Sequence, residues 1–248
     1  MISLKSEREL VMMRQAGKVV AEAIAEVERL VRPGVSTGEL NARVESLMTH
    51  RGARPAFKGY HGYPASICTS VNHEIVHGIP GLKVLKEGDI ISIDIGAEMN
   101  GYFADAAITL PVGEIDAVSR RLIETTAQAL EAGIRQCTTD KRLSDISYAI
   151  QCVAETAGFS VVREYVGHGI GRAMHEDPQV PNYGRPGRGI KLSPGLVLAI
   201  EPMVNVGGYE TNVLADNWTV VTKDGSRSAH FEHTVVITPR GPEILTRC

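Results

Sequence analysis

The sequence of 248 residues lacks the cysteine patterns that cross-link small proteins or hold structural metals. Its four cysteines are Cys68, Cys137, Cys152 and Cys248, and no two of them form a C-x-x-C pair. Neither a zinc knuckle nor a disulfide framework is therefore indicated, and a reducing compartment fits best. A formal net charge of -3 supplies no general field for nucleic acid or anionic lipid, so neither is an expected partner.

Long hydrophobic segments are also lacking. The first residues are charged where a signal peptide would be apolar. The longest apolar runs, such as 195–200, fall far short of the roughly 20 residues that cross a bilayer. We therefore expect a soluble, cytoplasmic protein. With 43% hydrophobic residues, the chain can bury a sizeable core, either as one domain or as two fused halves.

Helical patterns followed by strand-like segments occur twice along the chain. Capping boxes that begin at Ser6 and Ser36 predict two helices, which Pro33 and Gly52 end. The strands predicted for this first half are 66–71, 89–97 and 102–111. The helices predicted for the second half, which continues with further strands, are 119–136 and 143–157.

The two halves also share short stretches of sequence. Residues 85–94 align with 192–201 without a gap, and leucine, glycine, isoleucine and the final acid match. A second match pairs 103–113 with 231–241. A glycine turn before an apolar strand is common, so recurrence of that arrangement is an alternative to a true duplication.

The repeated order of helices and strands favours duplication. It predicts one α+β domain, 1–248, with pseudo-symmetric halves at about 1–113 and 114–248. Equivalent acids of the two halves would then meet near a pseudo-twofold axis. That axis is a natural position for a symmetric pair of metal ions.

Four acids are embedded in strand-like apolar sequence, where an unpaired ionised carboxylate would be costly. They are Asp94, Asp105, Glu201 and Glu232. Singly, each could be a strand-end acid that faces solvent or caps a turn. Together they would repel one another and retain protons unless cations balanced them. Two divalent ions carry a matching positive charge, so the pattern predicts a binuclear metal site.

His168 is the candidate for a fifth ligand. It lies between Gly167 and Gly169, which leave the imidazole accessible. The alternative is a loop histidine that hydrogen-bonds to the backbone. One imidazole with four carboxylates suits Mn, Fe or Co better than a structural zinc, whereas Zn stays an alternative for a catalytic site.

These five residues occur among motifs that resemble those of type I methionine aminopeptidases. The resemblance extends over essentially the whole chain. Its further segments are Tyr60-His61-Gly62-Tyr63-Pro64, His77-Gly78-Ile79-Pro80, Ile93-Asp94-Ile95-Gly96, Gly167-His168-Gly169-Ile170-Gly171, His175-Glu176-Asp177-Pro178 and Glu201-Pro202-Met203. It implies the pita-bread fold, a pseudo-twofold antiparallel sheet with helices on its outer face and two metals at its centre. That fold agrees with the predicted duplication.

The resemblance implies a metal-dependent hydrolase that removes the initiator methionine from nascent proteins and peptides, preferably before a small second residue. In that family Asp94 would bind one metal through both oxygens, and Asp105 with Glu232 would bridge the pair. The remaining ligands would be His168 and Glu201. A water between the ions would attack the first peptide bond.

Three residues would assist this reaction, again by resemblance. Glu201 would pass the proton of the water to the leaving amine. His77 and His175 would contact the scissile amide and stabilise the tetrahedral intermediate. The alternative for both histidines is an ordinary position in a loop.

The same resemblance implies an apolar pocket for the methionine side chain. Its lining would be Phe57, Tyr60, Tyr63, Cys68, Met174 and Trp218, with His77 and His175 beside them. Family members often have Cys at the position of Phe57 and Phe at that of Met174, which would give this pocket a different shape. Met174 is flexible and can still pack a thioether, whereas Trp218 also fits a role as a core aromatic residue.

The resemblance further suggests a monovalent cation beside Asn72 and Ser228. We expect a monomer that acts on nascent polypeptide N-termini, with the ribosome as a candidate partner that no motif identifies. An X-Pro aminopeptidase or prolidase of the same fold is the first alternative, but such enzymes usually carry an extra N-terminal domain. A non-catalytic binding protein is the second, and it would typically have lost metal ligands.

Overall fold

The first half of the computed structural model, which describes residues 2–247, is two helices and a long hairpin. Its elements are α1 (Glu7–Leu30), α2 (Thr37–His50), β1 (Arg54–Pro55), the short 3-10 helix η1 (Tyr60–Gly62), β2 (Cys68–Val71), β3 (Glu74–Val76), β4 (Ile90–Met99) and β5 (Tyr102–Pro111). Both predicted capping boxes are present: the backbone N–H groups of Ser6 and Ser36 donate to the carboxylates of Glu9 and Glu39 at 2.9 and 2.7 Å. Met1 and Cys248 lie outside the described residues.

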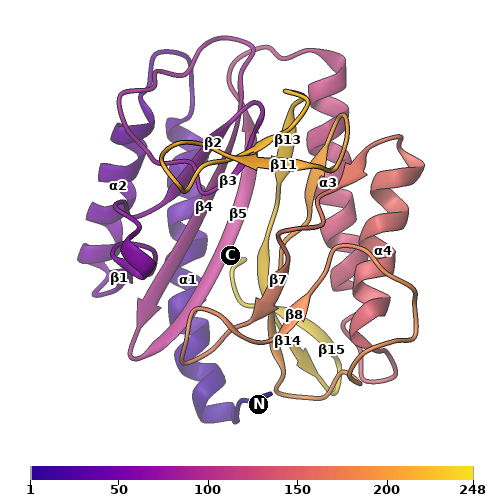
Figure 1. The fold of residues 1–248 in the computed structure, drawn as a ribbon. Coiled ribbons are helices and arrows are strands. Elements are labelled where there is room, and N and C mark those ends of the chain that lie inside the picture. Colours follow the sequence, from indigo (N-terminus) through magenta and orange to yellow (C-terminus); the bar gives the residue numbers. More distant parts are fainter. Residues whose placement is uncertain (1, 248) are drawn as a thin grey trace.

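The second half repeats the order of two helices and then strands. Its elements are α3 (Ala117–Ile134), α4 (Leu143–Thr156), β6 (Ser160–Val161), β7 (Gly167–Gly169), β8 (Glu176–Val180), β9 (Val197–Ile200), β10 (Met203–Asn205), β11 (Thr211–Val213), β12 (Val220–Thr222), β13 (Ser228–His230), β14 (His233–Thr238) and β15 (Gly241–Ile244). Figure 1 shows α1 and α2 on one side of the molecule, α3 and α4 on the other, and strands of both halves between them.

Several predicted boundaries differ from the structure by one or two residues, and two of these differences have a physical explanation. The helix predicted from residue 119 begins at Ala117, because Asp116 is its N-cap and accepts the Ser119 N–H at 2.8 Å. The strand predicted from residue 66 begins at Cys68, because the Ser66 N–H donates instead to a side chain of α2, Asn41 Oδ1, at 2.9 Å. The helix cap satisfies an N–H that the first turn leaves unpaired, whereas before β2 a side chain takes an N–H that strand pairing would have used.

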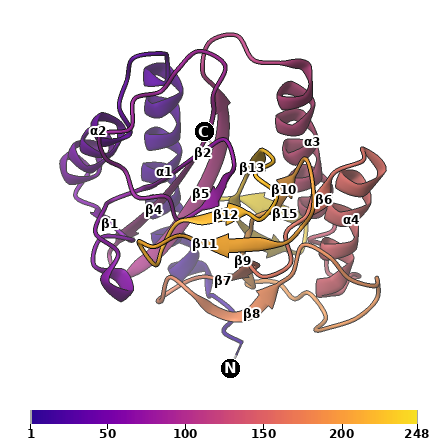
Figure 2. The same cartoon turned by 45° about the horizontal axis from the view of Figure 1, so that its top comes forward.

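The paired strands of the two halves are equivalent. β4 pairs with β5 antiparallel, and β9 pairs with β14 antiparallel. Ala107 of β5 and Glu232, just before β14, exchange backbone hydrogen bonds at 2.9 and 3.3 Å, so the two hairpins adjoin at the centre. Figure 2 shows the helix pairs flanking this central region from a second direction. The α+β pita-bread prediction is confirmed, whereas a single domain with the predicted bounds stays a prediction.

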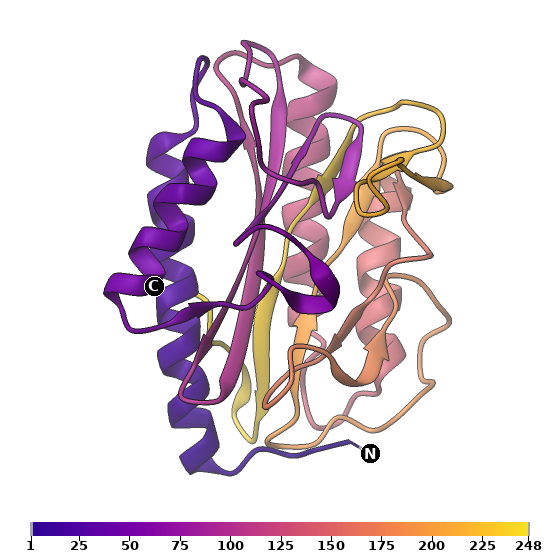
Figure 3. The ribbon, with the colours of Figure 1, turned by 60° about the vertical axis from the view of Figure 1, so that its left-hand side comes forward.

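Each half has its own hydrophobic core. One core lies between α1, α2 and the β4–β5 hairpin, and includes Val20, Leu40 and Ile93. The other lies between α3, α4 and β9, and includes Leu122 and Leu198. Figure 3 shows α1 and α2 running together along one side of the strands. Because both cores are on the helical side, the opposite side of the strands is left for polar residues and a cavity.

None of the helices in residues 2–247 combines the length and the apolar character that crossing a bilayer would require.

Candidate metal centre and adjoining pocket

The four predicted acids come from the equivalent hairpins of the two halves. Asp94 lies in β4 opposite Ala107, and Asp105 lies in β5 opposite Gly96. Those positions are diagonal neighbours on one face of the ladder, so both carboxylates face the same side. Glu201 directly follows β9, and Glu232 directly precedes β14. The register of two antiparallel pairs therefore brings together acids that are up to 138 positions apart, from 94 to 232.

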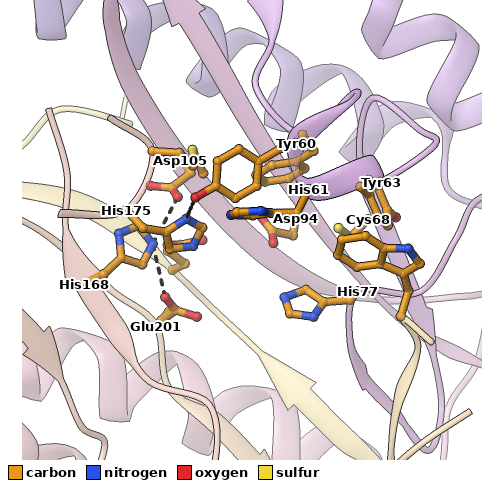
Figure 4. A pocket seen from close by; sticks show the side chains of 14 residues that line it. Tyr60, His61, Tyr63, Cys68, His77, Asp94, Asp105, His168, His175 and Glu201 are labelled. Atoms are coloured by element: carbon orange, nitrogen blue, oxygen red, sulfur yellow. Dashed lines mark hydrogen bonds and ion pairs between the residues drawn. The ribbon is translucent and has the colours of Figure 1, made fainter. Parts of the chain in front are cut away.

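His168 lies among these acids. Its Nε2 is 3.6 Å from Asp105 Oδ2 and 3.6 Å from Glu201 Oε1. One ligand atom each from Asp105, His168 and Glu232 lies within 4.8 Å of the others, and all three residues are buried. Asp94 Oδ1 is buried with no hydrogen-bond partner among residues 2–247. Figure 4 shows Asp105, His168 and Glu201 converging on one region of the cavity.

The protonation states of this cluster follow from burial. Burial, and then the charge of neighbouring acids, raises the pKa of Asp94, Glu201 and Glu232 well above the ordinary carboxyl value. Burial likewise raises the pKa of Asp105 to about 7. In His168 burial acts in the opposite sense and lowers the pKa to about 4, so the imidazole is neutral at pH 7.

The donor set fits divalent cations. A bound cation would offset the repulsion among the four carboxylates and would give the unpartnered buried oxygen of Asp94 a partner. The one neutral imidazole is a further ligand for it. These donors do not discriminate further among the first-row divalent metals. Positive charge at the cluster would bring the carboxyl pKa values back down, because an opposite charge favours the ionised form.

A cavity of about 440 Å³ adjoins the cluster. Its lining includes every residue predicted as metal ligand, catalytic group or pocket wall, and also His61. These residues are Phe57, Tyr60, Tyr63, Cys68, His77, Asp94, Asp105, His168, Met174, His175, Glu201, Trp218 and Glu232. His61 was not predicted to be a site residue, although it stands within the Tyr60 to Pro64 motif. The lining therefore comes from both halves of the chain.

One end of the cavity is aromatic and apolar. The rings of Tyr63 and Trp218 meet edge to face with centroids 5.1 Å apart. Trp218 is fixed by its backbone N–H, which donates to Asp216 Oδ1 at 2.9 Å. Phe57 lies against Gly96, where a Cβ would come within 2.7 Å of the ring. Glycine at this strand position therefore admits the phenylalanine beside Asp94.

Two further histidines face the cavity between its aromatic and acidic ends. Burial and a neighbouring histidine lower the pKa values of His77 and His175 to about 4, so both are neutral at pH 7. His175 Nδ1 is 2.8 Å from the Tyr60 hydroxyl. When that hydroxyl donates, the ring proton of His175 is on Nε2. Figure 4 shows His175 beside His168, and His77 on the opposite side of the cavity near Cys68.

Two residues next to the acids were not predicted from the sequence to belong to the site. Thr234 Oγ1 accepts the Asp105 N–H at 3.0 Å and lies 3.1 Å from Asp105 Oδ1. His230 is 1% exposed, both of its ring nitrogens lack a hydrogen-bond partner among the described residues, and its Nε2 is 3.8 Å from Glu201 Oε2. No local signal marks Thr234. His230, however, stands two residues before Glu232, and residues at that spacing in extended chain share a face.

Asn72 and Ser228 are adjacent, as the suggested cation site requires. The Ser228 N–H donates to the Asn72 carbonyl oxygen at 2.8 Å. Both ends of the Asn72 amide are also engaged, with Asp89 Oδ1 at 2.8 Å and the Ile90 N–H at 3.1 Å. Oxygens of the backbone and of Ser228 are therefore the ligands left for a cation.

Comparison with known proteins connects this site with one family. A family profile described as metallopeptidase family M24 matches residues 11–239. Methionine aminopeptidase 1 of Bacillus subtilis is 56% identical over 247 residues and covers 100% of both chains. The crystal structure of a methionine aminopeptidase from Thermotoga maritima has a TM-score of 0.99 at 48% identity and covers 100% of both chains.

A more distant structure shares the fold alone. The prolidase of Pyrococcus furiosus has a TM-score of 0.81 at 23% identity, with 99% of this chain and 65% of that chain covered. Its additional length matches the expectation that proline-directed peptidases of this fold are larger.

Proposed function

The chain belongs to metallopeptidase family M24, and we propose that it is a methionine aminopeptidase that removes the N-terminal methionine from nascent polypeptides and peptides. The observation that carries the proposal is the single cavity of about 440 Å³ in which an aromatic, apolar end adjoins a cluster of four acids and a histidine. An apolar end suits a methionine side chain, and the adjoining cluster suits metal-assisted hydrolysis.

Two divalent ions would be held by the acids and His168. Asp94, Asp105, Glu201 and Glu232 are the proposed carboxylate ligands, and Mn, Fe or Co is the expected metal, with Zn as the alternative. Such ions supply Lewis acidity and make water nucleophilic at neutral pH. The proposal also includes a monovalent cation bound beside Asn72 and Ser228.

The protein groups have separate tasks. Glu201 receives a proton and delivers it to the leaving amine, a role that its place in the cavity beside the other acids supports. His77 and His175 are neutral and donate hydrogen bonds to the scissile amide and to the developing negative charge on its oxygen. The Tyr60 hydroxyl supports this role in His175, because its contact with Nδ1 leaves the proton on Nε2.

The apolar end selects methionine. Tyr63, Cys68 and Met174 are each 5% exposed or less and give the side chain a largely dehydrated environment. Phe57 and Trp218 complete the wall. We include a preference for a small second residue in the proposal.

The two alternatives are less well supported. Methionine aminopeptidases match over the whole chain at up to 56% identity, whereas the prolidase at 23% supports the fold alone. A binding protein without activity would have no need for the complete set of candidate ligands around the cavity. The proposed location of the protein is the cytoplasm, where it would act as a monomer on polypeptide N-termini. The ribosome is its proposed partner.

The proposal is tested with metal-stripped protein that is resupplied separately with Mn, Fe, Co or Zn. Each preparation is incubated with Met-Ala, Met-Lys and Ala-Pro peptides, and the products are identified by mass spectrometry. Metal-dependent release of methionine from the Met-Ala peptide is the expected result. Cleavage of the Ala-Pro peptide instead would favour a proline-directed enzyme, and no cleavage with any metal would favour a binding protein.

A further inference from the structure

The segment before α1 crosses the second half of the molecule and buries a lysine there. Lys5 is 6% exposed, although lysine is rarely buried without a partner. Its backbone N–H donates to the Gly195 carbonyl oxygen at 2.7 Å. Its Nζ donates to Glu176 Oε2 at 2.6 Å and lies 3.3 Å from the Ser3 carbonyl oxygen. The ammonium thus forms an ion pair with a carboxylate that is far away in the sequence.

Glu176 connects Lys5 to the loop between β7 and β8. Its second oxygen, Oε1, accepts the backbone N–H groups of Arg172 and Ala173 at 2.7 and 3.2 Å. One carboxylate therefore joins the buried ammonium to two backbone amides of this loop. The same loop carries Met174 and His175 into the cavity.

Two glycines make room for Lys5, one for its side chain and one for its backbone. A Cβ at Gly171 would lie 2.2 Å from Lys5 Cε, and a Cβ at Gly195 would lie 2.6 Å from the Lys5 carbonyl oxygen. Lys5 is therefore packed tightly between the loop after β7 and the turn before β9. This closeness shows that the lysine is part of the support of the loop.

The loop 170–175 also has other contacts. Residues 170–175 form neither helix nor strand. The Phe103 N–H donates to the Gly171 carbonyl oxygen at 2.8 Å, the Ile170 N–H donates to the Val197 carbonyl oxygen at 3.3 Å, and His175 Nδ1 lies 2.8 Å from the Tyr60 hydroxyl. Arg172 pairs with Glu9 at 3.3 Å, but its side chain is 69% exposed, and exposed pairs of this kind stabilise little. The pair of Lys5 and Glu176, whose side chains are 2% and 18% exposed, is therefore the least exposed ion pair that supports the loop.

We propose that Lys5 is a positioning residue for the reaction: through Glu176 it holds the loop 170–175 so that Met174 closes the methionine pocket and His175 faces the scissile amide. The inference rests on the proposed function. It makes the segment before α1 a part of the active site, although no residue of that segment lines the cavity.

The first test measures hydrogen exchange and needs no substrate. In Lys5→Met, which keeps an unbranched side chain as far as Cε but removes the ammonium, the amides of Arg172 and Ala173 should exchange about tenfold faster, since their acceptor is released. Exchange in α3 should not change. Lys141→Met is the matched control, because Lys141 is 41% exposed and lies 3.9 Å from its neighbour Asp140. Wild-type exchange of the loop in Lys5→Met overturns the proposal.

The second test is kinetic. Lys5→Met should lower kcat on a Met-Ala peptide by roughly tenfold, because small displacements of catalytic groups reduce rates strongly. If Lys5 acts through His175, the same substitution in a His175→Ala background should lower kcat by less than about twofold. Equal losses in both backgrounds would contradict the positioning role.

A wild-type protein that does not release methionine refutes the proposed function and leaves the exchange result to decide this inference. If Lys5→Met fails to fold, Glu176→Gln takes its place, since it keeps the shape and an acceptor oxygen. Faster loop exchange in Glu176→Gln supports the proposal, and wild-type exchange rejects it. Lys5→Arg, which keeps the charge, should recover most of the kcat.

Discussion

The proposed metal cluster and the proposed methionine pocket lie in one cavity but arise from different parts of the architecture. Asp94 with Asp105 and Glu201 with Glu232 lie on or next to the equivalent hairpins of the two halves. The pocket residues instead lie outside these hairpins: in 57–77 before β4, and in the 170–175 loop with Trp218 in the second half. The comparison teaches that the paired hairpins supply the acids, while segments outside them line the proposed pocket.

The strongest way to break the cluster is Glu201→Ala. Loss of a proposed ligand and proton carrier should lower kcat by about 10³-fold or more, near the upper range for a general acid–base group. Folding should persist, because Glu201 follows β9 and removing it lessens repulsion among the acids. Steady-state kinetics with saturating metal measure the first effect, and circular dichroism the second. A variant with more than a tenth of the wild-type kcat would refute this role.

A smaller effect on the same cluster is expected from His230→Leu. Glu201 Oε2 is the nearest carboxylate oxygen to His230 Nε2, at 3.8 Å, and no other partner exists among the described residues. Groups that orient a ligand typically change metal affinity by about 10–100-fold, so we expect a loss in that range. Calorimetric metal titration measures it directly. His230→Gln keeps a donor and should recover most of the affinity, and a Leu variant with wild-type affinity would contradict the assignment.

The pocket should respond differently to Met174→Ala. Met174 is 2% exposed, and shortening it leaves a void against the bound side chain. We expect KM for a Met-Ala peptide to rise roughly tenfold, the size of a lost apolar contact in a specificity pocket. Metal affinity should stay at the wild-type value. Met174→Leu conserves volume and is the matched control. Equal weakening of metal affinity and of KM would mean that the two regions are not separable.

The residues of the two regions also differ in how far the sequence alone could predict them. Ser6 and Ser36 marked helix starts because a capping box is a local signal, and the aligned stretches ending in Asp94 and Glu201 identified two candidate ligands by physical reasoning. Phe57 and Met174 have no such signal, and only a family resemblance brought them into one pocket. Thr234 contacts Asp105 across 129 positions, which only the folded hairpins reveal.

The smallest effect concerns pH and the metal-free protein. Burial raises the pKa of Asp105 to about 7, so its contribution to stability is complete below the unfolded value near pH 4 and is lost as pH rises through 7. Burial and neighbouring acids raise the pKa of Glu201 well above its ordinary value, so its contribution is likewise lost as pH rises through that raised pKa. Burial lowers the pKa values of His77 and His175 to about 4, so their contribution is complete above about pH 6.5 and falls toward pH 4.

Below about pH 6.5, a fall in pH therefore increases the contribution of the acids to stability and decreases that of the histidines. Above about pH 6.5, only the contribution of the acids changes with pH. We expect the Tm of metal-free protein to fall by a few degrees between about pH 6.5 and 8.5 as the crowded carboxylates ionise. Asp105→Asn should reduce that fall, because one of the acids can no longer ionise. Saturating divalent metal should abolish it, because bound cations favour the ionised carboxylates. Scanning fluorimetry at constant ionic strength measures all three, and a Tm that rises across this range without metal would show that the acids are not crowded in solution.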